Sequence, residues 1–140
     1  MSPEKDGIFQ VCKTIDFCYG HRLLNYDGKC RHLHGHNARV EVLLERSHLD
    51  DRGMVVDFVE IKQTLQRWID ETLDHKMILS ETDPILPELQ KQKEPVYPMA
   101  ANPTAENLAR LIFEQARRLG FPAVQVTFWE TPTSFATYRG

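Results

Sequence analysis

The segment Cys30-Arg-His-Leu-His-Gly-His36 leads into Ala38–Glu45, where apolar and polar residues alternate. Alternation with a period of two is typical of a strand that buries one face. His34 and His36 have the same parity as the apolar residues of that run, so an extended chain directs both imidazoles to one face. The stretch therefore predicts a half-buried strand that begins with two neighbouring imidazoles.

These imidazoles suggest a metal site. Two of them on one face supply half of a tetrahedral zinc site, and His21, arriving from another element, would supply a third ligand. Three histidines with an open fourth position are typical of catalytic zinc, whereas structural zinc has four protein ligands. Cys30 either closes the site as the fourth ligand or stands beside the metal as a reactive thiol. The first alternative indicates a zinc-stapled binding module, that is, a binding domain whose fold is stabilised by a structural zinc ion. The second alternative indicates an enzyme. His32 has the opposite parity and is interpreted as a non-ligand.

The rest of the chain predicts further strands and two long helices. Strands are expected at the alternating runs Phe9–Phe17, Ala38–Glu45, Met54–Val56, Ala123–Glu130 and Thr137–Arg139. Helical spacing and capping residues predict one helix from Asp57 to about His75 and another from Pro103, at its first position, to Gly120. Between them, Ser80–Ala101 is expected to be a connecting segment with a short helix at Leu86–Lys91.

This order of elements predicts an α+β fold. We expect a single domain over residues 1–140, with a four-stranded antiparallel sheet covered on one face by two helices. Such a sheet leaves two unpaired edges, and edges of this kind are commonly paired by oligomerisation. A homo-oligomer is therefore expected.

The composition excludes several classes of partner. The formal net charge of the 140 residues is −3, which gives no basic field for a nucleic acid. Basic residues do gather around the histidines and indicate an anionic small ligand. No apolar run approaches the roughly 20 residues that span a bilayer, and no signal peptide is expected. The three scattered cysteines are typical of free thiols in the cytoplasm, where we expect the protein to act.

Six short motifs, in order along nearly the whole chain, resemble the 6-pyruvoyl-tetrahydropterin synthase family. They are Gly-His-Arg-Leu (20–23), Cys-Arg-His-Leu-His-Gly-His (30–36), Val-Asp-Phe (56–58), Leu-Asp-His (73–75), Asn-Pro-Thr-Ala-Glu-Asn-Leu-Ala (102–109) and Trp-Glu-Thr (129–131). The spacing Cys-x-x-x-His-x-His is similar to that of the bacterial, carboxy-forming branch in the queuosine pathway.

The resemblance implies a fold and an assembly. The fold is the tunnelling fold, in which three subunits close a twelve-stranded β-barrel and two trimers stack as a hexamer. It also implies roles for particular residues. Zinc would be bound by His21, His34 and His36. Cys30, Asp74 and His75 would be catalytic, and Glu130 would anchor the pterin ring. Thr104 and Glu106 would approach the pterin from a neighbouring subunit.

The implied reaction is that of a zinc-dependent lyase. It converts 7,8-dihydroneopterin triphosphate to 6-carboxy-5,6,7,8-tetrahydropterin, acetaldehyde and triphosphate, with Zn²⁺ as the cofactor. Three alternatives remain open at this point. One is a 6-pyruvoyl-tetrahydropterin synthase, which stops after triphosphate elimination. Another is an aldolase-like family member that acts on dihydroneopterin phosphates in folate synthesis. The third is the zinc-stapled binding module.

Overall fold

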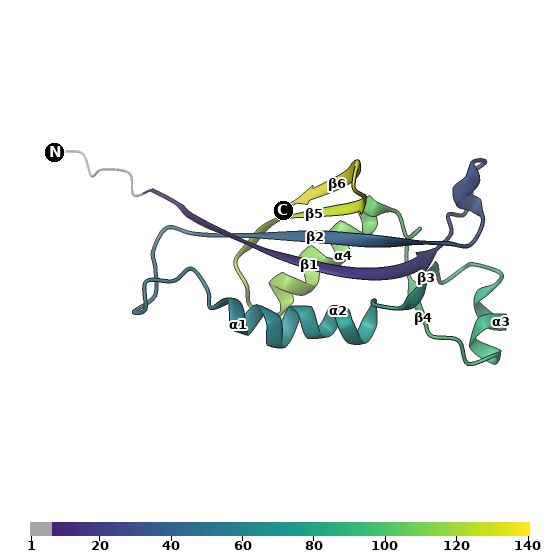
Figure 1. The fold of residues 1–140 in the computed structure, drawn as a ribbon, viewed down its shortest axis with the longest axis horizontal. Helices are drawn as coiled ribbons and strands as arrows, with labels where there is room; N and C mark the ends of the chain where they lie inside the picture. Colours follow the sequence, from purple (N-terminus) through teal and green to yellow (C-terminus); the bar gives the residue numbers. More distant parts are fainter. Residues whose placement is uncertain (1–6) are drawn as a thin grey trace.

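The computed structural model describes residues 7–140, which form one curled, mixed sheet with helices on one face (Figure 1). The sheet has six strands in the order β4-β3-β1-β2-β5-β6. The strands are β1 (Phe9–His21), β2 (His34–Arg46), β3 (Lys76–Ser80), β4 (Val96–Met99), β5 (Ala123–Thr131) and β6 (Ser134–Arg139). The expected α+β class is therefore confirmed, and the expected number of strands is wrong.

The expected four-stranded antiparallel sheet is only the larger part of the observed one. Strands β1, β2, β5 and β6 pair antiparallel to their neighbours. Strand β3 pairs with β1 in parallel, and β4 pairs with β3 in parallel. Both additional strands are short, and β4 lies in the segment 80–101 that was expected to be a connection. Its Pro98 is tolerated because β4 is an edge strand of the sheet within the chain.

The helices cover the apolar face of the sheet. The first is a continuous helical segment made of α1 (Phe58–Ile61), a π-helical stretch at Lys62–Gln66, and α2 (Arg67–Thr72). The second is α4 (Ala105–Arg118), and the short helix α3 (Leu86–Lys91) lies where it was expected. One core cluster joins the helices to β1, β2 and β5, and its fully buried members include Leu65, Ile112 and Phe128.

Several predicted boundaries are wrong. Met54–Val56 is not a strand, and α4 begins at Ala105, two residues later than the expected Pro103, with Thr104 as its cap. Strand β1 continues past its expected end at Phe17 to His21, and β2 begins at His34 rather than at Ala38. The consequence is important for the site, because the extended strands pair His21 with His34 in register.

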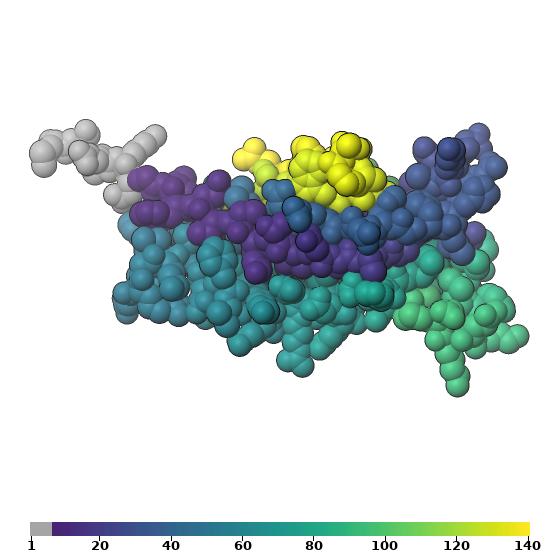
Figure 2. Space-filling model, in the orientation of Figure 1, coloured from purple at the N-terminus to yellow at the C-terminus, as the bar shows by residue number. Residues whose placement is uncertain are grey.

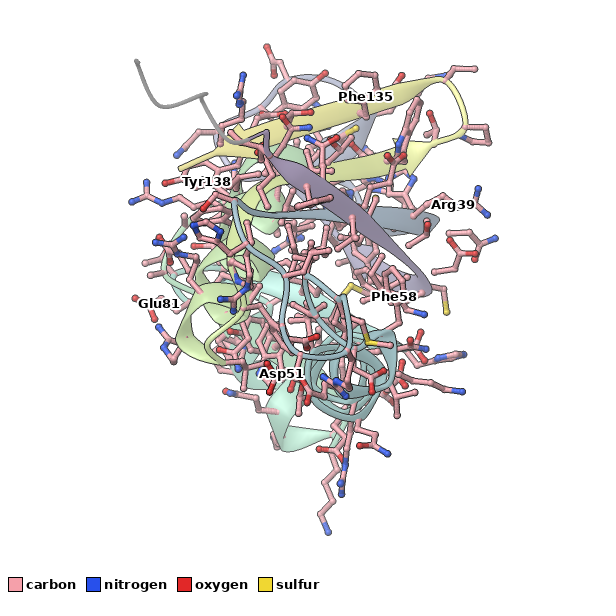
Figure 3. All side chains as sticks on the ribbon, turned by 90° about the vertical axis from the view of Figure 1, so that its left-hand side faces the viewer. Arg39, Asp51, Phe58, Glu81, Phe135 and Tyr138 are labelled. Carbon is pink, nitrogen blue, oxygen red and sulfur yellow. The ribbon has the colours of Figure 1, made fainter. Side chains whose placement is uncertain are left out.

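The two faces of the sheet differ in chemistry. Side chains such as Tyr138, which packs on Phe113 of α4, lie on the helix-covered face, whereas Arg39 projects from the open face (Figure 3). At the end of the sheet opposite to the N-terminus, the β1–β2 connection lies above the segment that carries α3 (Figure 2). Within residues 7–140, no helix is long and apolar enough to cross a membrane.

Candidate functional site

Three imidazoles converge where β1 ends and β2 begins. His21, His34 and His36 all lie on the helix-covered face, because they share the parity of the buried residues of their strands. The register pairs His21 with His34 and Tyr19 with His36, which brings the three rings together. Their potential ligand atoms, together with a carboxylate oxygen of Glu130, lie within 4.8 Å of one another. The structure thus assembles the three predicted ligands in one cluster.

Hydrogen bonds to backbone carbonyls fix two of the rings. The Nδ1 atom of His21 lies 2.7 Å from the carbonyl oxygen of Pro103, and that of His34 lies 2.6 Å from the carbonyl oxygen of His32. A carbonyl only accepts hydrogen bonds, so each Nδ1 carries a proton and donates it. In the neutral rings, Nε2 then carries no proton, and its lone pair is directed into the cluster. Such outer hydrogen bonds are typical of histidines that bind a metal.

Glu130, near the end of β5, provides a fourth group. Its Oε1 lies 2.9 Å from Nε2 of His36 and 3.4 Å from Nε2 of His21. The close approach of His21, together with the other two imidazoles, holds the pKa of Glu130 below its usual value, although partial burial opposes this. Burial, together with the other two imidazoles, lowers the pKa of His36 in spite of Glu130. The carboxylate is therefore ionised and His36 is neutral, which are the forms that bind metals.

The cluster fits a tetrahedral metal ion. The Nε2 atoms of His21 and His34 are only 3.0 Å apart. In the neutral rings each of these atoms carries a lone pair and no proton, so neither can donate a hydrogen bond to the other. The buried Nε2 of His36 has no hydrogen-bond partner among the described residues, because its short approach to Glu130 lacks the geometry of a hydrogen bond. A zinc ion with bonds of about 2.0–2.1 Å places neighbouring donor atoms about 3.3 Å apart. A positive charge at the centre of the cluster would satisfy all of these atoms.

Cys30 lies outside this cluster. It belongs to the single 3-10 turn Lys29–Arg31 in the β1–β2 connection, where its thiol is free and half-buried. Its carbonyl oxygen accepts a hydrogen bond from the amide of Leu23, which closes the connection back on itself. Cys30 was considered as a fourth ligand, but among the described residues it is Glu130, expected only as the pterin anchor, that joins the imidazoles.

Asp74 and His75 form a hydrogen-bonded pair just before β3. Nδ1 of His75 donates to Oδ2 of Asp74 at 2.8 Å, which leaves Nε2 free on a ring that is 77% exposed. Burial alone would raise the pKa of Asp74, but hydrogen bonds from the Cys18 amide and from His75 outweigh it and lower that pKa. His75 has a φ of +60°, a left-handed conformation that is uncommon for a residue other than glycine. The pair can hold and move a proton at Nε2.

The three predicted catalytic residues do not share one cluster of ligand atoms within 4.8 Å among the described residues. The ligand atoms of Asp74 and His75 cluster with the thiol of Cys18, and Cys30 belongs to neither cluster of the described residues. Cys18 was not predicted to be a site residue. The sequence held a signal for it only in the alternation of β1, which places it on the face opposite to His21.

The remaining predicted residues lie at the start of α4. The hydroxyl of Thr104 caps the helix by accepting a hydrogen bond from the amide of Asn107 at 3.1 Å. Glu106 is exposed in the first turn. The side chain of Asn102 accepts a hydrogen bond from the amide of Leu24 and donates one to its carbonyl oxygen. The segment before α4 therefore also holds the chain that follows His21.

Two supporting features could not be found from the sequence. Arg22 donates two hydrogen bonds to the buried carboxylate of Asp83, which anchors the end of β1 to the turn before α3. Tyr19 is buried between the ligands, with its ring centroid 5.1 Å from that of His21, and its hydroxyl has no hydrogen-bond partner among the described residues. Burial, with Glu130 and Cys30 nearby, raises the pKa of Tyr19.

Comparisons with known proteins agree on one family. The family described as 6-pyruvoyl tetrahydropterin synthase matches residues 10–140. A 6-carboxy-5,6,7,8-tetrahydropterin synthase of Rickettsia bellii is 34% identical over 138 residues, covering 91% of this chain and 98% of that protein. An enzyme of the same name from Aquifex aeolicus is 34% identical and covers 94% and 98% of the two chains. The structure of Caenorhabditis elegans 6-pyruvoyl tetrahydropterin synthase matches with a TM-score of 0.71 at 27% identity, covering 96% of both chains.

These matches extend over nearly the whole of each protein. The chain belongs to the 6-pyruvoyl tetrahydropterin synthase family and is an enzyme, a lyase, as its motifs predicted.

Proposed function

We propose that the protein is a zinc-dependent lyase that converts 7,8-dihydroneopterin triphosphate to 6-carboxy-5,6,7,8-tetrahydropterin, acetaldehyde and triphosphate, a step of queuosine synthesis. The observation that carries this proposal is the cluster of His21, His34 and His36, in which carbonyl oxygens hold the Nδ1 protons of His21 and His34. The names of the relatives in Rickettsia bellii and Aquifex aeolicus support the carboxy-forming reaction.

The three imidazoles would hold Zn²⁺, which supplies a Lewis acid that polarises the side-chain hydroxyls of the substrate. Cys30 would remove the proton from the adjacent carbon. Its position supports this role, because the thiol is free, half-buried, and outside the group of metal ligands.

His75 would give or accept the proton on the other side of the substrate. Asp74 fixes its tautomer, because Nδ1–H donates to the carboxylate and Nε2 is left to exchange a proton. Since Cys30 and His75 belong to no common cluster within the chain, we propose that each active site combines Cys30 of one subunit with Asp74 and His75 of another.

Glu130 would anchor the pterin ring. Its Oε1 faces His36 and His21, and the side chain keeps 25% of its surface exposed, so the carboxylate can still accept hydrogen bonds from an amino group and a ring N–H. The same position suits a fourth metal ligand, and metal analysis of a Glu130 variant separates the two roles. Thr104 and Glu106 would approach the pterin of a neighbouring subunit.

The assembly that we propose is a hexamer of two trimers. Strands β4 and β6 are the edges of the sheet within one chain, and their free backbone groups favour pairing with another copy. A barrel closed by three sheets would remove these edges. It would also bring residues of neighbouring subunits together, as a shared active site requires.

The reaction is tested by the products that the purified, zinc-loaded protein forms from 7,8-dihydroneopterin triphosphate. Release of acetaldehyde together with triphosphate is the expected result. Triphosphate without acetaldehyde would identify the pyruvoyl-forming reaction instead. Retention of triphosphate with cleavage of the side chain would identify the aldolase-like alternative.

A further inference from the structure

The buried hydroxyl of Tyr19 has no role in the proposed reaction. Tyr19 is only 3% exposed, and its hydroxyl has no hydrogen-bond partner among the described residues. Burying a hydroxyl without a partner costs free energy, and a phenylalanine would fill the same space without that cost. A hydroxyl kept at this position indicates a partner that joins it in the working enzyme.

The rings of Tyr19 and Phe128 meet across β2. Their centroids are 5.7 Å apart, although β2 separates β1 from β5 and two such strand spacings amount to about 9–10 Å. Strand β2 leaves room for this contact because it buries the small Ala38 on the same face. Glu130 follows Phe128 on that face of β5, among the imidazoles. Burial and the charge of Glu130 raise the pKa of Tyr19, so the hydroxyl and the carboxylate are close enough to interact.

Of these two side chains, Tyr19 is fixed and Glu130 can turn. Four aromatic rings surround that of Tyr19 with centroids 5.1–5.7 Å away, those of Phe17, His21, His36 and Phe128. Glu130 has three rotatable side-chain bonds, and 25% of its side chain is exposed. Nε2 of His21 carries no proton in the neutral ring, and the approach of His36 lacks the geometry of a hydrogen bond. Neither imidazole therefore holds the carboxylate by a hydrogen bond, and it is free to turn towards the hydroxyl.

We propose that Tyr19 is a positioning residue, whose hydroxyl donates a hydrogen bond to the carboxylate of Glu130 when a pterin is bound. A phenol is protonated at neutral pH and donates, and an ionised carboxylate has about four acceptor sites. The carboxylate therefore accepts from Tyr19 and still accepts from the amino group and the ring N–H of the pterin. The bond holds the carboxylate in one orientation, which reduces the entropy lost on binding. This inference rests on the proposed role of Glu130 as the pterin anchor.

The test is the binding of neopterin, a fluorescent pterin without phosphate groups, to the zinc-loaded oligomer of the parent and of Tyr19→Phe. The variant lacks one oxygen atom, and we expect the dissociation constant to rise about 10-fold, the lower end for a hydrogen bond to a charged group. Without neopterin, the same variant removes an unpaired buried hydroxyl, so the melting temperature should stay the same or rise. Zinc content should be unchanged. A tyrosine with only a structural role would show the opposite pattern, with a lower melting temperature and unchanged binding.

Two further variants make the test specific. Tyr138→Phe is the matched control, because the Tyr138 ring also packs between sheet and helix, 5.0 Å from that of Phe113, but lies outside the histidine cluster. It should bind neopterin as the parent does. Glu130→Gln shows whether Tyr19 acts through the carboxylate. In that background Tyr19→Phe should raise the dissociation constant no more than about 3-fold, because the charged acceptor of the hydrogen bond is gone.

The outcomes separate this inference from the proposed function. If Tyr19→Phe binds neopterin as the parent does while Glu130→Gln binds it more weakly, the inference is wrong and the pterin anchor stands. An equal effect of Tyr19→Phe in both backgrounds would also overturn the inference. If Glu130→Gln binds neopterin as tightly as the parent, the anchor is wrong and the inference falls with it. The readout is binding and not turnover, so the outcome does not depend on which pterin reaction the enzyme catalyses.

Discussion

The histidine cluster and the Asp74–His75 pair both lie near the end of β1 but differ in how complete they are. The cluster is on the helix-covered face, where His21 is fully buried and its ring is held by the carbonyl oxygen of Pro103. His75 is on the open side with most of its ring in solvent, and its predicted partner Cys30 is elsewhere. A metal centre needs fixed donors and is built within one chain, whereas a proton-transfer group keeps its free side for a substrate or another subunit.

The largest effect is expected at the metal centre. His34→Ala removes one of three imidazoles and should weaken zinc binding more than about 100-fold, because even an outer hydrogen-bond partner is commonly worth 10- to 100-fold. Zinc content after dialysis is the measurement. The control is His32→Ala, which changes a side chain of the same segment that lies outside the cluster and keeps the carbonyl bonded to His34. Equal zinc content in the two variants would show that the ligand assignment is wrong.

The sharing of sites between subunits can be tested by mixing inactive variants. Cys30→Ala should keep zinc and fold but lose turnover, and His75→Asn should do the same. When the two proteins are unfolded and refolded together, about a quarter of the sites in a random oligomer would combine intact residues from both. Activity should therefore return to about a quarter of that of the parent. If every mixture stays inactive while each variant assembles normally, the two residues act within one chain.

Glu130→Gln separates an anchor from a metal ligand. The amide keeps the shape but loses the charge, so substrate binding should weaken by about 2–3 kcal/mol, the usual range for hydrogen bonds to charged groups. This corresponds to about 30- to 150-fold in the dissociation constant. Zinc content should be unchanged, because the three imidazoles remain. Zinc loss would instead make Glu130 the fourth ligand, and unchanged substrate binding would remove it from the pterin site.

A smaller, pH-dependent effect is expected from the pair that anchors the end of β1. Hydrogen bonds from Arg22 lower the pKa of the buried Asp83, so the ionised form stabilises the folded state. This stabilisation is fully present above the unfolded pKa of about 3.9 and is lost as the pH falls through the lower, folded pKa. Asp83→Asn should therefore cost about 2 kcal/mol near neutral pH.

Thermal unfolding from pH 7 to pH 3 measures this effect, and the difference in melting temperature between parent and variant should shrink below about pH 4. A constant difference over that range would mean that Asp83 contributes through its shape and not through its charge.

The neighbouring positions of His34 and His36 could be predicted from the sequence because one rule, the alternation of a strand, decides them. The alternation of β2 places His34 and His36 on the apolar face, and the structure confirms that parity. The approach of Glu130 could not be predicted, since it depends on the register between β2 and β5. Strand β4 was missed because four residues that include Pro98 lack the alternation of a longer strand. The expected strand at Met54–Val56 is wrong because so short an apolar run forms a strand only when a partner is available, and none pairs with it in the described sheet.

The left-handed backbone of His75 has a consequence for how such an enzyme can change over time. Only glycine, asparagine and aspartate share this conformation readily, so these are the replacements that the fold accepts at little cost. Each of them lacks the imidazole. A descendant could therefore lose its proton-transfer group in a single step and persist as a stable, zinc-binding but inactive protein. At His21 no such separation is available, because the ring that would bind the metal is also fully buried.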